Sequence, residues 1–202
     1  YEYEIKSFGI KVAKCGIAIS DTIYNNESSI LLEYSVSTLN IFNRLYPVNN
    51  KYTIIINSNN STTYFKKYTT QPKITNSIET KIIDDKVYYS DSNYYIPPNT
   101  LNIFSLLYLL MKNPDKINFD NNSILEREGK MYSYSIINKD KEYMLNLLAI
   151  DDDEGLIKYT DIFTWAIFKD NVKRHIYIND NRIDKCVVKN RFFNFSAEYI
   201  DR

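Results

Sequence analysis

The chain has 202 residues, with 25 basic and 25 acidic side chains, and therefore carries no net charge at neutral pH. A chain of this length can bury one core without disulfides or metals, so we expect a single domain over residues 1–202. Zero net charge argues against a nucleic-acid-binding protein, because binding to phosphates needs a basic excess. The four glycines, Gly9, Gly16, Gly129 and Gly155, are too scattered for a glycine-rich loop that holds nucleotide phosphates.

Apolar and polar residues alternate along most of the chain, which predicts β-strands. In residues 1–20 the alternation changes phase beside Gly9 and Gly16. We therefore expect a strongly curved strand, or two strands, with a bulge or sharp bend at each glycine. A further strand is expected around residues 32–37. The other predicted strands are paired across polar turns: 51–57 with 62–68, 77–83 with 86–90, 130–137 with 142–150, 156–168 with 173–179, and 182–189 with 193–200.

Residues 101–111 interrupt this pattern with a leucine-rich run that is apolar nearly all round. Asn99 or Thr100 can cap a helix there and Pro114 can end it, so we predict one buried helix at about residues 100–112. At about 1.5 Å per residue this helix is too short to span a bilayer, and no other run is long enough. Residues 114–124 are expected to form an irregular loop. The predicted fold class is mainly β, a curved antiparallel sheet around one helix.

Few residues suit catalysis or metal binding. His175 is the only histidine, which excludes a multi-histidine metal site, and it is interpreted as a strand residue without a catalytic role. The run Asp151-Asp152-Asp153-Glu154 could hold a hard cation such as calcium, but an acidic turn is the favoured interpretation. An enzyme, the least favoured class, would need this run to share a cleft with a carboxylate such as Asp161. The basic pairs at 66–67 and 173–174 are interpreted as solvated strand faces or turns.

Cys15 and Cys186 lie near opposite ends of the chain, both in predicted strands. In an oxidising compartment the pair could form a disulfide, provided that the two Cα atoms lie within about 7 Å. Cysteine is also a common small buried residue in strands, and two free thiols are the favoured interpretation.

One aromatic residue in a strand and three residues of the helix could line a ligand cavity. The predicted strand that contains Trp165 is apolar on both faces and is therefore expected to be central and buried. Ordinary core packing is the alternative for all four residues. The candidate cavity residues are Phe104, Leu107, Tyr108 and Trp165.

Four stretches follow one another in an order that matches a known family: Phe8 to Lys14 (FGIKVAK), Leu39 to Tyr52 (LNIFNRLYPVNNKY), Ile96 to Tyr108 (IPPNTLNIFSLLY) and, more weakly, Phe163 to Asp170 (FTWAIFKD). Together they resemble the DUF3108 family, bacterial envelope proteins of unknown function that are related in fold to the lipoprotein carriers LolA and LolB. The chain departs from the family pattern at Ala13, Asn102 and His175, where the family often has Gly, Asp and, nearby, Pro.

The resemblance implies a LolA-like half-barrel, in which one highly curved antiparallel sheet wraps around the helix. It also implies export to the periplasm or cell envelope with removal of a signal peptide, and we interpret the start at Tyr1, without Met, as that of a processed chain. It assigns no catalytic residue. We also expect no cofactor. We therefore expect a non-enzymatic envelope protein whose concave sheet face binds a lipid, another apolar ligand or a lipidated protein. The alternative is a structural or interaction module with an envelope protein as partner.

Overall fold

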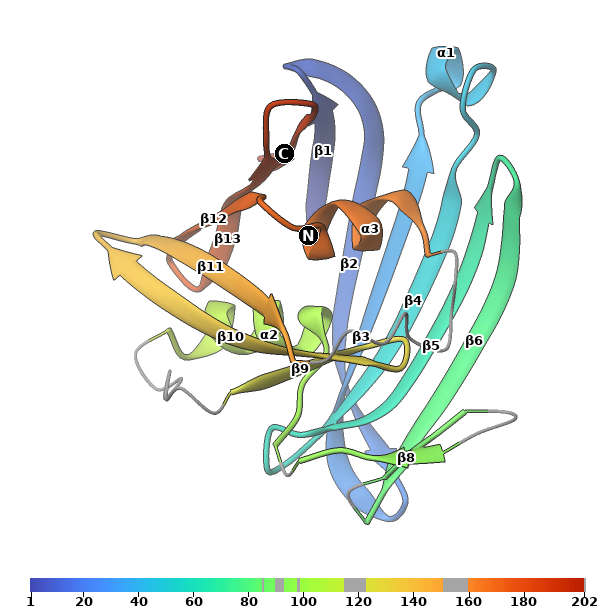
Figure 1. Ribbon diagram of the computed structural model, residues 1–202, viewed down its shortest axis with the longest axis vertical. Helices are drawn as coiled ribbons and strands as arrows, with labels where there is room; N and C mark the ends of the chain where they lie inside the picture. The colour runs from blue at the N-terminus through green and yellow to red at the C-terminus, as the bar shows by residue number, and fades with distance from the viewer. Residues whose placement is uncertain (85, 90–92, 98, 115–122, 151–159, 202) are drawn as a thin grey trace.

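The computed structural model describes residues 1–84, 86–89, 93–97, 99–114, 123–150 and 160–201. Within these ranges, fourteen strands form one antiparallel sheet in the order β8-β7-β6-β5-β4-β3-β2-β1-β14-β13-β12-β11-β10-β9 (Figure 1). The sheet curves around a central helix and is not closed, since β8 and β9 are its two ends. The predicted fold class, a mainly β and highly curved antiparallel sheet, is confirmed.

The N-terminal strands are β1 (Glu2–Ser7), β2 (Ile10–Tyr24), β3 (Glu27–Thr38), β4 (Asn49–Asn57), β5 (Thr62–Gln71), β6 (Ile74–Ile83), β7 (Lys86–Tyr88) and β8 (Asn93–Tyr95). The C-terminal strands are β9 (Ile124–Arg127), β10 (Lys130–Lys139), β11 (Glu142–Ala149), β12 (Lys173–Asn179), β13 (Arg182–Lys189) and β14 (Asn194–Tyr199). The helices are α1 (Asn40–Asn43), α2 (Ile103–Lys112) and α3 (Ile162–Phe168). Among the described residues, none of these helices has the length and apolarity of a bilayer-spanning segment.

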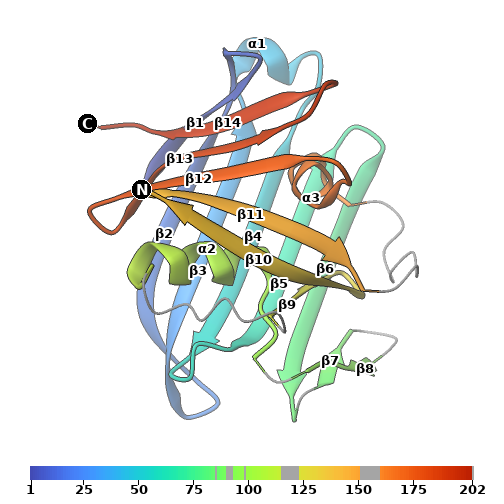
Figure 2. The ribbon, with the colours of Figure 1, turned by 60° about the vertical axis from the view of Figure 1, so that its left-hand side comes forward.

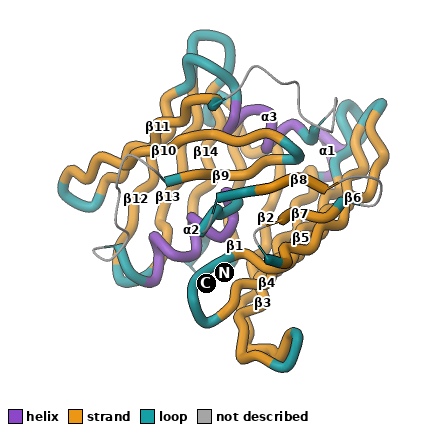
Figure 3. Tube along the Cα trace, turned by 60° about the horizontal axis from the view of Figure 1, so that its bottom comes forward, coloured by secondary structure: helices purple, strands orange, loops and turns teal. Residues whose placement is uncertain are grey.

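Two sequential ladders, β1 to β8 and β9 to β14, meet where the two ends of the chain pair with each other. Tyr3 lies opposite Tyr199, and the Ile200 amide donates to the Glu2 carbonyl at 2.9 Å. The two ends of the chain therefore lie side by side (Figure 3). At the far edge of the second ladder, Leu101 forms a parallel bridge with Leu125, so the segment that leads into α2 covers part of β9. The wall of N-terminal strands and the crossing C-terminal strands are seen in Figure 2.

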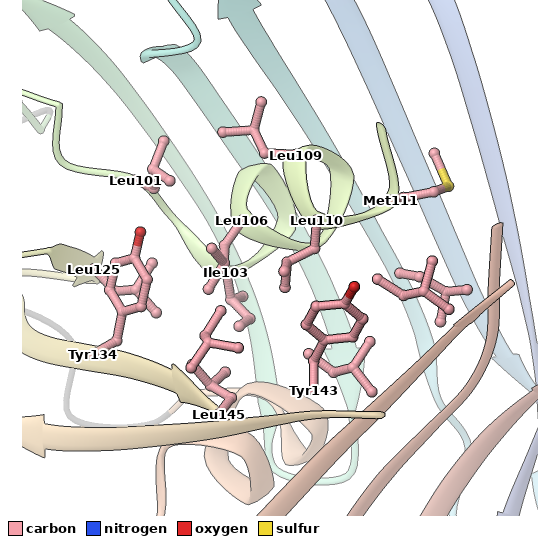
Figure 4. Close-up of a cluster of buried hydrophobic side chains, with 14 of the residues drawn as sticks. Leu101, Ile103, Leu106, Leu109, Leu110, Met111, Leu125, Tyr134, Tyr143 and Leu145 are labelled. Atoms are coloured by element: carbon pink, nitrogen blue, oxygen red, sulfur yellow. The ribbon is translucent and has the colours of Figure 1, made fainter. Parts of the chain in front are cut away.

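Helix α2 lies inside the curve of the sheet. Its N-cap is Asn102, whose Oδ1 accepts from the Ser105 amide at 2.8 Å, so the helix begins slightly later than predicted. Figure 4 shows Leu106 and Leu110 directed towards Tyr143 and Leu145 of β11. On another side, the ring of Phe104 packs against Tyr34 and Tyr52, with ring centroids 4.8 and 4.6 Å apart. Because it contacts both ladders, α2 is the main connection inside the core.

The predicted strand at 156–168 is wrong in the part that the structure describes. Residues 162–168 form helix α3, and residues 156–159 lie outside the described residues. Asp161 is the N-cap, and its Oδ1 accepts from the amides of Phe163 and Thr164 at 3.0 Å each. The β-branched and aromatic residues of this run favour a strand, but the cap and packing on the sheet override that propensity.

A bend was predicted at each of two glycines, and the structure has one at Gly9 but none at Gly16. Gly9 forms, with Phe8, a two-residue turn between β1 and β2, and both residues have positive φ, as a type I′ hairpin turn requires. Gly16 lies in the regular part of β2, without a register shift. A Cβ at this position would lie 3.1 Å from the Ser35 Oγ, so close strand contact is the reason for this glycine. The bulge lies instead beside Val12.

Candidate ligand pocket

An apolar pocket of about 170 Å³ lies between the concave face of the sheet and the two helices α2 and α3. Its floor is made of alternate residues on strands from both ladders, since every second side chain of a strand faces the same way. Helix α2 contributes Phe104 and Leu107. Helix α3 contributes Phe163, Ala166 and Ile167. The floor residues include Tyr3, Ile5, Cys15, Ile17, Tyr34, Val36, Tyr52, Ile183, Cys186, Val188, Phe195 and Ala197.

Small side chains in the floor help to leave this space open. Ala197 of β14 lies opposite Ile5 on one neighbouring strand and opposite Cys186 on the other. The central strand therefore presents only a methyl group at this point. Phe163 and Ala166 of α3 line the pocket, and side chains of this helix pack against Phe193 and Phe195.

The structure brings two of the four predicted cavity residues into this pocket. Phe104 and Leu107 line it, whereas Tyr108 lines a hollow of about 10 Å³ beside it. The prediction that Trp165 is central and buried is wrong. Its side chain is 41% exposed, because it lies on the outer side of α3. Its ring packs on Phe193 at 5.5 Å between centroids. Sequence analysis missed its neighbours Phe163, Ala166 and Ile167, since helical spacing, and not alternation, decides which residues of this run face inward.

Three hydroxyl groups at the pocket wall, those of Tyr34, Tyr52 and Thr164, are hydrogen-bonded to the protein. The Tyr34 hydroxyl donates to the Phe104 carbonyl at 3.5 Å, and the Thr164 hydroxyl donates to Asp161 Oδ2 at 2.6 Å. The Tyr52 hydroxyl accepts from Asn50 Nδ2 at 3.1 Å. The pocket therefore offers an arriving ligand mainly carbon surface.

Both cysteines line the pocket as free thiols. Cys15 lies on β2 and Cys186 on β13, and strands β1 and β14 separate them. At about 4.8 Å per strand this separation exceeds the reach of a disulfide. Burial raises the pKa of Cys15 and of Cys186 to about 12. At neutral pH both groups are protonated, which makes them poor nucleophiles.

A buried ionic cluster holds α3 in place beside the pocket. The Lys67 side chain is fully buried, and its Nζ donates to Glu128 Oε1, to Asp161 Oδ2 at 2.9 Å and to Thr160 Oγ1 at 3.0 Å. Burial by itself would raise the pKa of Asp161, but the Lys67 ammonium and hydrogen bonds from Thr164 hold it below its usual value. Because Asp161 is also the N-cap of α3, this cluster fastens the start of the helix to β5.

Two basic residues that sequence analysis assigned to solvated faces or turns are therefore buried. Lys67 belongs to the cluster, and Arg174 donates to the carbonyls of Ile167, of Lys169 at 2.8 Å and of Val172 at 3.0 Å, so it binds the end of α3. The alternation in β5 contains a signal for this, because the inward residues after Phe65 are polar at 67, 69 and 71. Only the tertiary structure supplies the partners of those polar residues.

Within the described part of the chain, the other candidate groups do not form a second site. His175 lies in β12, where its Nδ1 is 2.5 Å from Glu142 Oε1, and it does not line the pocket. The acidic run at 151–154 lies outside the described residues. Asp161, its proposed partner in an enzyme, is bound to Lys67. Across the described ranges, no group of three or more side chains is arranged to hold a metal ion.

No protein-family model matches the chain, and no curated protein matches its sequence. A solved structure, a β-barrel-like protein of the domain of unknown function DUF1849 from Brucella abortus, is similar with a TM-score of 0.56 and 7% sequence identity. The similarity covers 98% of this chain and 94% of the other. The comparison does not support DUF3108 specifically, and at this identity it concerns the fold alone. The chain thus has a β-barrel-like fold that it shares, over nearly its whole length, with a protein of unknown function.

Proposed function

We propose that this chain is a non-enzymatic binding protein of the bacterial cell envelope, and that the pocket takes up a small apolar group such as one end of an acyl chain. The observation that carries the proposal is the pocket itself, which joins residues from both ladders and both helices. Three of its hydroxyl groups are hydrogen-bonded to the protein, and its two thiols are protonated at neutral pH. Such a site favours binding over chemistry.

The size of the pocket limits the ligand. A dry cavity of about 150 Å³ in another protein binds benzene, and sites for drug-sized ligands begin at roughly 300 Å³. At about 170 Å³ this pocket suits one ring or a short stretch of methylenes. Most of a longer ligand would lie outside it.

The envelope location is supported by the resemblance to the DUF3108 family. That resemblance predicted a curved sheet around a helix, and the fold agrees at that coarser level. A location in the periplasm or envelope and membership of DUF3108 are part of the proposal. Detection of the native chain in a periplasmic extract by immunoblotting, against a cytoplasmic marker, tests the location.

Calorimetric titration of the full chain with dodecanoate tests the pocket. We expect saturable binding of one molecule, together with a lipid that mass spectrometry detects in native protein and not after delipidation. The variant Ala197→Leu fills part of the cavity and should weaken binding more than about tenfold, since about 1.4 kcal/mol corresponds to a factor of ten. Its matched control is Ala18→Leu, on the outer face of β2, which should bind as the native chain does.

The second candidate is a structural or interaction module, and the small size of the pocket favours it. Under that function, dodecanoate would not bind and native protein would carry no lipid. Equal binding by Ala197→Leu and the native chain would also contradict the pocket proposal, because it would place the ligand elsewhere.

A further inference from the structure

Large apolar side chains are exposed together at one end of the sheet, which we name the turn end. It comprises residues 8–11 at the β1–β2 turn, 39–48 around α1, 169–173 between α3 and β12, and 189–193 at the β13–β14 turn. Figures 1 and 2 show α1 and the β1–β2 turn at the top of the molecule. The exposed residues are Phe8, Ile10, Ile41, Leu45, Tyr46 and Phe192.

Backbone hydrogen bonds place these turns beside one another. The Phe8 amide donates to the Asn194 carbonyl at 2.9 Å, which joins the β1–β2 turn to the start of β14. The Leu39 amide donates to the Val12 carbonyl at 2.9 Å, which joins the loop around α1 to the start of β2. Leu45 and Phe192 are 79% and 67% exposed, so neighbouring turns at this end each present apolar side chains to solvent.

The turn end is strongly basic, although the whole chain has no net charge. Its four segments contain six cations and one carboxylate, that of Asp170, so they carry a formal charge of +5 and the rest of the chain carries −5. The net charge of zero therefore hides an uneven distribution. The six cations are Lys11, Arg44, Lys169, Lys173, Lys189 and Arg191. Lys11 forms a salt bridge of 2.7 Å with Glu4, a residue outside these segments.

Four of these cations surround an open groove of about 780 Å³, which Phe192 also lines. None of the four forms a salt bridge with a described residue. The Arg191 guanidinium lies 4.4 Å from the centroid of the Phe192 ring, so a cation and an apolar group are presented at the same place. This pairing suits the boundary between lipid headgroups and acyl chains. The four cations are Lys169, Lys173, Lys189 and Arg191.

We propose that the turn end docks on a membrane surface that carries anionic headgroups. The exposed apolar turns enter the interface, and the cations face the lipid phosphates. Charge complementarity selects this occupant, since each Lys or Arg near an anionic bilayer strengthens binding roughly fivefold. Docking involves the surface turns and not the pocket, so membrane binding and ligand binding can be confirmed or contradicted independently.

Flotation of the full chain with lipid vesicles tests this docking. We expect the chain to float with vesicles made of roughly three parts phosphatidylcholine and one part phosphatidylglycerol, and not with phosphatidylcholine alone. Sodium chloride at about 0.5 M should weaken binding at least tenfold, because it screens the charges. Absence of binding to the anionic vesicles would overturn the proposal. Cross-linking of a protein to this surface, without binding to the vesicles, would overturn it as well.

Two variants separate the apolar and the charged contributions. Leu45→Ser with Phe192→Ser removes apolar groups, and Lys189→Glu with Arg191→Glu reverses two charges; each should lower partitioning more than about tenfold. The matched controls are at other places: Ile23→Ser, 79% exposed in β2 near the β2–β3 turn, and Lys86→Glu, exposed on β7. Equal losses in the controls, or no loss in the turn-end variants, would show that binding does not use this surface.

Discussion

At the scale of residues, the most consequential side chain is Lys67. A lysine is rarely buried completely unless it is paired, and here two carboxylates share its ammonium group. These partners come from the β9–β10 turn and from the N-cap of α3, 61 and 94 residues away in the chain. One side chain therefore ties together β5, the second ladder and one wall of the pocket.

Replacement of Lys67 by Met should destabilise the fold severely. The variant leaves Glu128 and Asp161 buried without their cation, and loss of one partner of a buried pair costs about 3–5 kcal/mol. Its control is Lys66→Met, at a half-exposed ion pair with Glu79, for which we expect at most about 1 kcal/mol. Urea unfolding measures both free energies. A cost below about 1 kcal/mol for Lys67→Met would show that the cluster does not hold α3.

A second residue, Glu198, should make the stability depend on pH. Hydrogen bonds from Lys6 and Lys185 lower its pKa from 4.5 to about 2. The folded state therefore binds this proton less readily than the unfolded state does, so the stabilisation is present above pH 4.5 and is lost as the pH falls towards 2. In Glu198→Gln, the urea midpoint should fall less over this range than in the native chain. The exposed control is Glu33→Gln, whose urea midpoint should fall with pH as that of the native chain does. If the midpoint of Glu198→Gln fell just as steeply as in this control, the assignment to Glu198 would be wrong.

At the scale of elements, the two long helices differ in how far the sequence predicts them. Helix α2 was predicted because its run is rich in leucine and poor in β-branched residues. Helix α3 was missed because Ile162 to Phe168 has the composition of a strand. The local sequence signal for the start of this helix is the capping residue Asp161, followed three positions later by Thr164. The alternation of residue types that follows hides this signal. The sequence therefore predicts the pocket residues Phe104 and Leu107 on α2, but none of the pocket residues on α3.

The cap of α2 can be tested without a change to its apolar surface. Asn102→Ala removes the acceptor for the Ser105 amide and should cost about 1 kcal/mol in the free energy of unfolding. The control Asn102→Ser keeps a capping oxygen and should restore most of that loss. Thermal and urea unfolding report the difference. If the serine and alanine variants were equally destabilised, the loss would come from other contacts of the Asn102 side chain and not from the cap.

At the scale of the whole molecule, the strand order is sequential apart from one junction. Among the strands that the structure describes, β1 to β8 and β9 to β14 each pair with their neighbours in the chain, and the pairing of β1 with β14 joins the two distant ends. Tyr3 and Tyr199, opposite each other in this pairing, are 196 positions apart. Such a long-range contact slows folding, because the loop must close before the strands can pair.

A circular permutant tests this junction. A chain that starts at Asp115, continues through a short linker from Arg202 to Tyr1 and ends at Pro114 would place all fourteen strands in sequential order. We expect it to keep the native circular dichroism spectrum and to refold faster than the native chain in stopped-flow experiments. The control is the native order with the same linker appended at its end. Refolding no faster than in this control would show that closure of β1 on β14 does not limit the rate.

The sequence by itself determined the β class, most hairpins, the buried helix and the lack of an obvious catalytic motif. These follow from local alternation, turn residues and helix composition, which act over a few residues. Only the tertiary structure decided that residues 162–168 are helical, that Lys67 is buried, and that Ala197 and Cys186 line a pocket. It also gathered six cations and the exposed apolar turns at one end of a chain without net charge. These features depend on partners that the curved sheet brings together from distant parts of the chain, and no local pattern encodes such distances.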